Sequence, residues 1–295
     1  MYAQFFGTFL LSHNIVTKDQ LLSALGKKSS QHMKLGTLAI MKGYMTANEV
    51  DNVIISQTHN DCRFGDLAVR EGYLTQEQVD ELVKTQYPDF LLLGQTLVDE
   101  GYITNTQLET LIADYESENE LTDLDYSNEK QDDLDRILAN FFHSTDVAAD
   151  EYNASYMRLL FNDLTRFIGD DFTPLCFNPC KEYPVNYCVS QTIHGDLSAK
   201  VYLDMPETTC ISFASRYVNE EFTEFDEYVQ ASLEDFLNLH NGLYNVNISN
   251  TLGKELTLEA PEVVSDELID LSGSSYLLQV MYPFGVINFI FELKK

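Results

Sequence analysis

The chain has 295 residues, of which 47 are acidic and 18 basic, so its formal net charge is −29 at neutral pH. A surface this acidic repels phosphate groups, which argues against nucleic acid and anionic lipid as general partners. Hydrophobic residues make up 44% of the chain and aromatic residues 12%, so globular cores can form, and the length predicts about two domains. No apolar run reaches the ~18 residues of a membrane span, and we expect a cytoplasmic protein.

Residues 1–115 contain a sequence repeat with a period of 29 residues. One position of the repeat is always glycine: Gly7, Gly36, Gly65 and Gly94. A second is always threonine, followed three residues later by Gln or Glu: Thr17, Thr46, Thr75 and Thr104. This spacing is a capping box, which predicts that a helix begins after each threonine. A third position suits the left-handed conformation that ends a helix: Asn14, Gly43, Gly72 and Gly101.

We therefore predict an all-α domain built from four helix-turn-helix repeats, which bury a shared core. The repeats cover residues 1–29, 30–58, 59–87 and 88–115.

The repeats resemble the N-terminal domain of type II secretion and type IV pilus assembly ATPases, whose motif begins Arg-Leu-Gly and ends on Gln at its twenty-fourth position. Two segments, 34–57 and 63–86, fit the motif, the first with lysine in place of the leading arginine. The residues concerned are Lys34, Gly36, Gln57, Arg63, Gly65 and Gln86. One branch of that family binds cyclic di-GMP through two such motifs, so the resemblance implies a candidate nucleotide site. The alternative is that these residues are scaffolding of a module that docks a pilus, secretion or motility component. The resemblance does not extend to the ATPase half, because the phosphate-binding loop motif does not occur.

The next segment is strongly acidic. Residues 116–150 hold 11 acidic and 2 basic residues and show no useful hydrophobic periodicity. We expect a solvated acidic linker over residues 116–147.

Mixed α and β patterns follow over residues 148–295. We predict helices and strands in the order α-β-β-α-α-β-β-β, at residues 149–168, 187–193, 199–203, 207–217, 226–247, 255–259, 275–281 and 286–293. This order predicts an α+β domain of two layers, with helices packed on a mostly antiparallel sheet. We expect no metal site, because the six His and five Cys residues lack ligand spacing.

The helix predicted over residues 226–247 has an apolar core face and, nearly opposite, a polar face. Asp235 and Asn238 lie three residues apart on the polar face, so their side chains are neighbours. Ala231 and Gly242 flank them with almost no side chain. The backbone of a partner could therefore approach this face closely.

Residues 150–295 resemble the CheC/CheX family of chemotaxis phosphatases, whose signature is Asp/Ser-x-x-x-Glu-x-x-Asn followed by 22 residues and Pro. Asn238 and Pro261 have this spacing, and Gly242 stands where the family has a glycine. Two positions differ. The Glu of the signature is Asp235, one methylene shorter, and its leading Asp or Ser is Ala231.

The resemblance implies hydrolysis of the aspartyl phosphate of a CheY-like response regulator, which supplies Mg²⁺, so that the chain needs no cofactor of its own. Asn238 would orient the attacking water and Asp235 would pair with a lysine of the receiver. Ala231, Gly242 and Pro261 would lie on the docking face. The alternative is a non-catalytic adaptor, which binds a receiver or forms a homodimer through this domain, with cyclic di-GMP at the repeats as a regulator to be tested.

Overall fold

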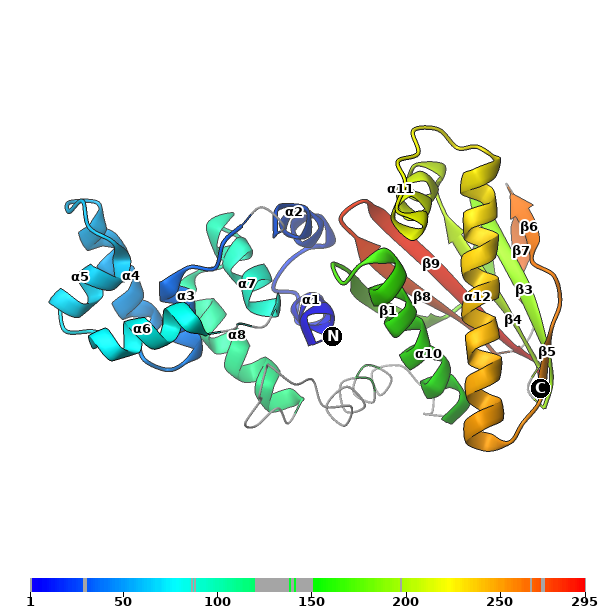
Figure 1. The fold of residues 1–295 in the computed structure, drawn as a ribbon, viewed down its shortest axis with the longest axis horizontal. Coiled ribbons are helices and arrows are strands. Elements are labelled where there is room, and N and C mark those ends of the chain that lie inside the picture. Colours follow the sequence, from blue (N-terminus) through cyan, green and yellow to red (C-terminus); the bar gives the residue numbers. More distant parts are fainter. Residues whose placement is uncertain are drawn as a thin grey trace. The chain divides into compact units, whose positions relative to one another are not determined.

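The computed structural model describes residues 2–28, 31–85, 87, 89–119, 138, 141, 151–196, 198–265, 267–271 and 274–294. The chain divides into two compact units, residues 1–137 and 138–295 (Figure 1). Gln86 and most of the expected acidic linker lie outside the described residues.

The first unit is entirely helical in its described part, as predicted. Its helices are α1 (Tyr2–Ser12), α2 (Lys18–Lys28), α3 (Leu35–Met41), α4 (Ala47–Gln57), α5 (Phe64–Arg70), α6 (Gln76–Lys84), α7 (Asp89–Asp99) and α8 (Asn105–Glu118). All four capping boxes form, and α2, α4, α6 and α8 each begin one residue after the repeated threonine. The four residues expected in the left-handed conformation have φ between 56° and 82°.

The four hairpins pack out of chain order, because the fourth lies against both the first and the second. Aromatic rings join the first hairpin to the fourth, with the centroids of Phe6 and Phe90 5.2 Å apart. Hydrogen bonds join the second to the fourth, from Asn105 Nδ2 to Asp51 Oδ1 at 2.7 Å. The third hairpin packs on the second through α5 and α6 (Figure 1).

The repeated glycines allow close packing inside the hairpins. A Cβ added to Gly36 would lie 2.8 Å from Val50 Cγ1, and one added to Gly94 would lie 2.5 Å from Leu108 Cδ1. Each glycine stands 14 residues before the apolar residue that it contacts. The same glycine contact therefore recurs between the two helices of each of these hairpins. This packing accounts for the glycine in each of these repeats.

The second unit is an α+β domain, as predicted. Its elements are α10 (Glu151–Asp163), a π-helical turn η1 (Leu164–Ile168), β1 (Thr173–Pro179), β2 (Glu182–Pro184), β3 (Tyr187–Gly195), β4 (Ser198–Met205), α11 (Glu207–Val218), α12 (Glu227–Leu252), β5 (Leu256–Leu258), β6 (Glu262–Ser265), β7 (Leu268–Asp270), β8 (Ser274–Tyr282) and β9 (Gly285–Lys294). The antiparallel main sheet has the order β1-β8-β9-β4-β3-β5, and β6 also pairs with β3. The helices cover one face of it (Figure 1).

Strands β1, β2, β6 and β7 were not predicted from the sequence, whereas β5 lies within the strand predicted over residues 255–259. Strand β1 begins and ends near Pro174 and Pro179, so it resembles a loop in sequence, but it is an edge strand, where proline is tolerated. Helix α12 also runs further than predicted, to Leu252, and ends at Gly253 with φ of 63°.

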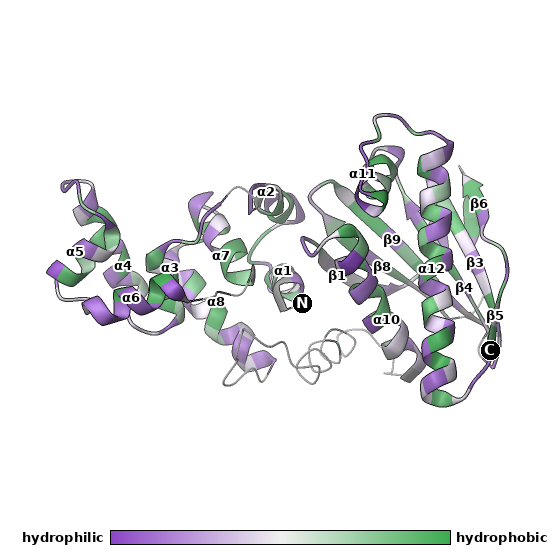
Figure 2. Ribbon diagram, in the orientation of Figure 1, coloured by the Kyte–Doolittle hydropathy of each residue, from purple (hydrophilic) through white to green (hydrophobic). Residues whose placement is uncertain are grey.

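The core of the second unit lies between α12 and the sheet. Val229, Leu233, Phe236 and Ile248 of α12 are fully buried. In Figure 2, α12 carries hydrophobic and hydrophilic residues along its whole length, as expected for a helix with one buried face. That division positions the candidate site.

Candidate functional site

One stripe of α12 faces away from the core. Residues spaced three or four apart share a helix face, and this set consists of Tyr228, Ala231, Asp235, Asn238, Gly242 and Val246. We call it the exposed stripe. Five of the six are exposed and Gly242 is partly exposed. The stripe is roughly 27 Å long at 1.5 Å per residue.

The two ends of the exposed stripe are apolar and its middle is polar. Tyr228 is 65% exposed and Val246 is 58% exposed, whereas Asp235 and Asn238 lie between them. The sequence motif covers the middle of the stripe and does not include these two ends. Their spacing from Asn238 in the helical repeat was the signal that could have revealed them.

Asp235 is held by a neighbouring helix. Tyr217 of α11 donates a hydrogen bond from its hydroxyl to Asp235 Oδ2 at 2.6 Å. The ring of Tyr217 packs edge-on against Phe236, with centroids 5.7 Å apart. Burial and the nearby Asp235 carboxylate raise the pKa of Tyr217. The hydroxyl therefore stays protonated and acts as a donor at physiological pH.

Asn238 is held by the sheet. Gln191 of β3 donates from Nε2 to Asn238 Oδ1 at 2.8 Å, and also to the backbone carbonyl of Glu259 at 2.8 Å. The side chain of Asn238 thus emerges at the surface with its oxygen tied on the inner side. Neither Gln191 nor Tyr217 belongs to the sequence motif, so neither was predicted from the sequence.

Pro261 lies where the partner of β3 changes. Leu258 pairs with Ile193 and Glu262 pairs with Ser190, so three residues lie opposite two at this break. Proline donates no backbone hydrogen bond, and an interrupted ladder needs none there. Pro261 thus belongs to the short segment between β5 and β6, in which the Glu259 carbonyl accepts a hydrogen bond from Gln191.

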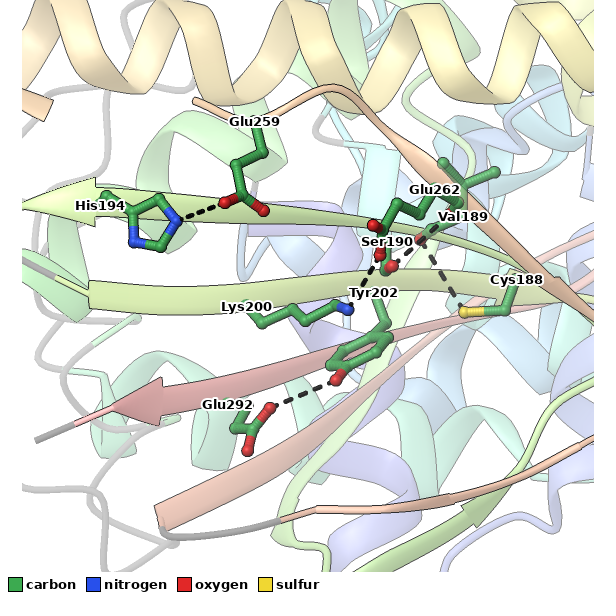
Figure 3. Close-up of polar contacts among 9 residues, drawn as sticks. All are labelled: Cys188, Val189, Ser190, His194, Lys200, Tyr202, Glu259, Glu262 and Glu292. Carbon is green, nitrogen blue, oxygen red and sulfur yellow. Dashed lines mark hydrogen bonds and ion pairs between the residues drawn. The ribbon is translucent and has the colours of Figure 1, made fainter. Parts of the chain in front are cut away.

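Glu259 is also anchored by its side chain, on the other face of the sheet. Its Oε1 lies 2.7 Å from His194 Nε2, and this bond, followed by one from Thr192, lowers the pKa of Glu259. Figure 3 shows this pair beside Lys200 with Glu262 and Tyr202 with Glu292, which cross the same region of the sheet. The His194 contact ties the segment that carries the Glu259 carbonyl to β3.

Gly242 has no internal packing partner. A Cβ added there would meet no atom within 4 Å, in contrast to Gly36 in the first unit. The glycine lowers helix stability by about 1 kcal/mol relative to alanine. Packing inside the domain therefore does not require a glycine at this position.

His240 lies on the opposite face of α12 and belongs to the core. Its side chain is 1% exposed and its Nδ1 lies 2.7 Å from Asp163 Oδ2. Burial lowers the pKa of His240 despite the nearby carboxylate. The neutral imidazole donates its Nδ1 proton to Asp163, so this pair is structural.

The candidate nucleotide residues of the first unit are divided between two cavities. Lys34, Gly36 and Gln57 line one of about 360 Å³, and Arg63 and Gly65 line another of about 650 Å³. The Lys34 ammonium group pairs with Asp99, which lines the first cavity.

Two further findings concern the described part of the chain. It contains no cluster of three His, Cys, Asp or Glu side chains that could hold a metal ion. No helix within it is long and apolar enough to cross a membrane.

The part of the chain that contains this site is similar to known proteins. Residues 187–285 match the family model described as chemotaxis phosphatase CheX, and this range includes Gln191, Asp235, Asn238 and Pro261. None of the curated protein sequences matches the chain.

Several solved structures are similar at low sequence identity. A CheC-like superfamily protein from Shewanella sp. PV-4 is 16% identical, with 50% of this chain and 100% of that chain covered and a TM-score of 0.45. CheX from Desulfovibrio desulfuricans is 13% identical, with 49% and 100% covered and a TM-score of 0.40. The CheX in a CheX–CheY complex with BeF₃ and Mg²⁺ from Borrelia burgdorferi is 16% identical, with 49% and 98% covered and a TM-score of 0.40. With the family match inside its sheet-and-helix core, the second unit carries a CheX-like domain at residues 187–285.

Proposed function

We propose that the second unit hydrolyses the aspartyl phosphate of a CheY-like response regulator, with the exposed stripe of α12 against the phosphorylation site. One observation carries this proposal. Asp235 and Asn238 lie next to each other on an exposed helix face, and each is held by a hydrogen bond from another element. They also lie within the residues that match the CheX family model.

In the reaction that we propose, a water oxygen attacks phosphorus in line with the bond to the aspartate oxygen. That bond breaks, its electron pair stays on the aspartate carboxylate, and both protons of the water leave with the phosphate as H₂PO₄⁻. The Asn238 amide both donates and accepts hydrogen bonds and can orient the water. This is catalysis by positioning, and Mg²⁺ comes from the receiver.

Asp235 takes the role of a partner for the lysine beside the phosphoaspartate. Aspartate is one methylene shorter than the glutamate of the family signature, so the two backbones must approach closely. Ala231 and Gly242 allow that approach, because neither carries a side chain beyond Cβ. Pro261 lies on the segment that borders this face, and Tyr228 and Val246 supply apolar contacts at its ends.

Phosphate release from a phosphorylated receiver domain tests the proposal. We expect the chain to accelerate release, and the variant Asn238→Ala to lose on the order of 100-fold of that acceleration. Asn250→Ala is a matched control, because Asn250 is exposed on the same helix about 18 Å further along. Binding of a receiver without any acceleration would favour the adaptor alternative, and a stable homodimer without receiver binding would favour its dimeric form.

For the first unit we infer a protein-docking module. An apolar residue stands eight positions after each repeated threonine. It is buried as Leu25 and Ile112 in the outer repeats, but as Ile54 and Val83 in the inner ones it is 44% and 72% exposed. Exposed apolar side chains suit a protein partner such as a pilus, secretion or motility component. Among the described residues that line the cavity of Lys34, this lysine is the one cation, and its ammonium group is paired with Asp99 rather than free for a phosphate.

Titration calorimetry with cyclic di-GMP separates the two interpretations of the repeats. We expect no heat at micromolar nucleotide. Heat that disappears in Lys34→Ala or Arg63→Ala would instead assign the repeats to nucleotide.

A further inference from the structure

A chain of three interior side chains leads to Asn238. Tyr156 of α10 donates from its hydroxyl to Asn241 Oδ1 at 2.7 Å, and Asn241 Nδ2 donates to Gln191 Oε1 at 2.8 Å. Gln191 Nε2 then donates to Asn238 Oδ1 at 2.8 Å. The chain thus joins α10, α12 and β3 and ends at the exposed stripe.

One backbone carbonyl determines the direction of every bond in this chain. A carbonyl can only accept, so the Glu259 oxygen requires the NH₂ end of Gln191 to face it. The Gln191 oxygen must then face Asn241, and the Asn241 oxygen must face the Tyr156 hydroxyl. The second N–H of Gln191 points to Asn238 and requires an oxygen there. Both N–H bonds of Asn238 and the second lone pair of its oxygen are therefore left for the surface.

Burying the polar side chain of Gln191 costs free energy of folding. It is 1% exposed and shares the inward face of β3 with Val189 and Ile193, which are equally buried. A buried amide without partners is destabilising, whereas an apolar residue of similar volume would pack there without that requirement. Tyr156 and Asn241 are also buried and serve as its partners.

We infer that Gln191 is a positioning residue, which holds the amide of Asn238 in the one orientation that can align the attacking water. The inference rests on the function proposed above. An exposed asparagine amide has two orientations of similar energy, related by a half-turn about its terminal torsion. In one orientation the Asn238 oxygen faces Gln191, and in the other its nitrogen does. The hydrogen bond from Gln191 selects the first orientation. Gln191 itself touches neither the water nor the receiver.

The test compares Gln191→Leu with a matched control, Gln279→Leu. Gln279 of β8 also donates to an asparagine oxygen, at 3.0 Å to Asn288, but on the far face of the sheet. We expect Gln191→Leu to lower kcat about tenfold, the change that corresponds to one lost hydrogen bond. KM for the phosphorylated receiver should stay unchanged, because Gln191 is buried, and Gln279→Leu should change neither constant.

Three outcomes of the kinetic test would overturn the inference while the proposed function stands. The first is an unchanged kcat in Gln191→Leu, and the second is a raised KM. The third is an equal loss of rate when Gln191→Leu is added to Asn238→Ala, since a residue that acts through Asn238 has no effect in its absence. Any of these results would leave Gln191 a merely structural residue.

A second measurement decides the inference without any turnover. The ¹⁵N order parameter of the Asn238 side-chain amide should lie near the rigid value of about 0.85 in the parent and fall below about 0.6 in Gln191→Leu. Equal order parameters in the two proteins would overturn the inference. If the parent releases no phosphate from any receiver, the proposed function fails, and the order parameter still decides whether Gln191 orients Asn238.

Discussion

The hydroxyl of Tyr217 lies 2.6 Å from Asp235 Oδ2 and donates a hydrogen bond to it across the gap between α11 and α12. A carboxylate has about four acceptor sites, so this bond leaves room for a cation from a partner. The bond selects one rotamer of Asp235 before any partner arrives. Part of the entropy cost of docking is therefore met within the free protein.

Replacing Tyr217 by phenylalanine removes this bond and keeps the ring packing. We expect the free energy of unfolding to fall by about 1 kcal/mol and KM for a phosphorylated receiver to rise about threefold, with kcat unchanged. Urea unfolding and steady-state phosphate release measure the two effects. In an Asp235→Ala background the same substitution should leave KM unaltered, and a further rise there would show that Tyr217 acts elsewhere.

Gly242→Ala should separate stability from docking. The added Cβ meets no internal atom, so we expect the free energy of unfolding to rise by about 0.5–1 kcal/mol. The same methyl group lies on the exposed stripe and should raise KM. A variant that is more stable and docks equally well would show that the partner does not approach this part of α12.

The apolar ends of the exposed stripe should contribute to docking and not to chemistry. We expect Tyr228→Ala and Val246→Ala each to raise KM several-fold and to leave kcat unchanged, because each loses apolar contact area of roughly 25 cal/mol per Å². Leu268→Ala is the control, since Leu268 is similarly exposed, at 63%, on strand β7, which pairs with β2. A fall in kcat with constant KM would contradict a docking role.

Acid should destabilise the second unit through His240. Burial lowers the pKa of His240 in the folded state, so the unfolded chain binds the proton first as the pH falls. Stability that is fully present above about pH 6.5 is then lost toward the folded pKa, at up to about 1.4 kcal/mol per pH unit. Urea unfolding from pH 7.5 downward measures this slope, which should be smaller in the double variant His240→Gln with Asp163→Asn. Parallel slopes would show that other groups dominate.

Gly36→Ala tests whether this glycine is needed for packing in the repeats. The new methyl group would lie 2.8 Å from Val50 and 3.2 Å from Phe64, and such overpacking typically costs about 1–3 kcal/mol. Gly26→Ala in α2 is the matched control, because no atom lies within 4 Å of its added Cβ, and it should stabilise the unit. Differential scanning calorimetry of the two variants should show melting shifts of opposite sign.

Much of this architecture was predictable because its causes are local. A capping box joins residues three apart, so Thr46 and Glu49 alone are enough to predict the start of α4. A left-handed residue such as Gly72 reflects its own backbone freedom. The exposed face of α12 follows from helical periodicity, which placed Asp235 and Asn238 side by side before any fold was known.

The parts that were not predictable depend on residues far apart in the chain. Nothing near Phe6 indicates that it packs on Phe90, so the order of the hairpins could not be read from the repeat. The prolines of β1 are typical of a loop, and the segment is a strand only because it pairs with β8 at the edge of the sheet.

The helical repeats, the two-layer domain and the polar pair on α12 could be predicted because they follow from periodicity and from contacts between near neighbours. The contacts that hold that pair could not, because they form only in the folded domain. Gln191 and Asn238 are 47 residues apart, and Tyr217 and Asp235 are joined only when α11 packs against α12. Such bonds depend on the register and packing of whole elements, which no local pattern encodes.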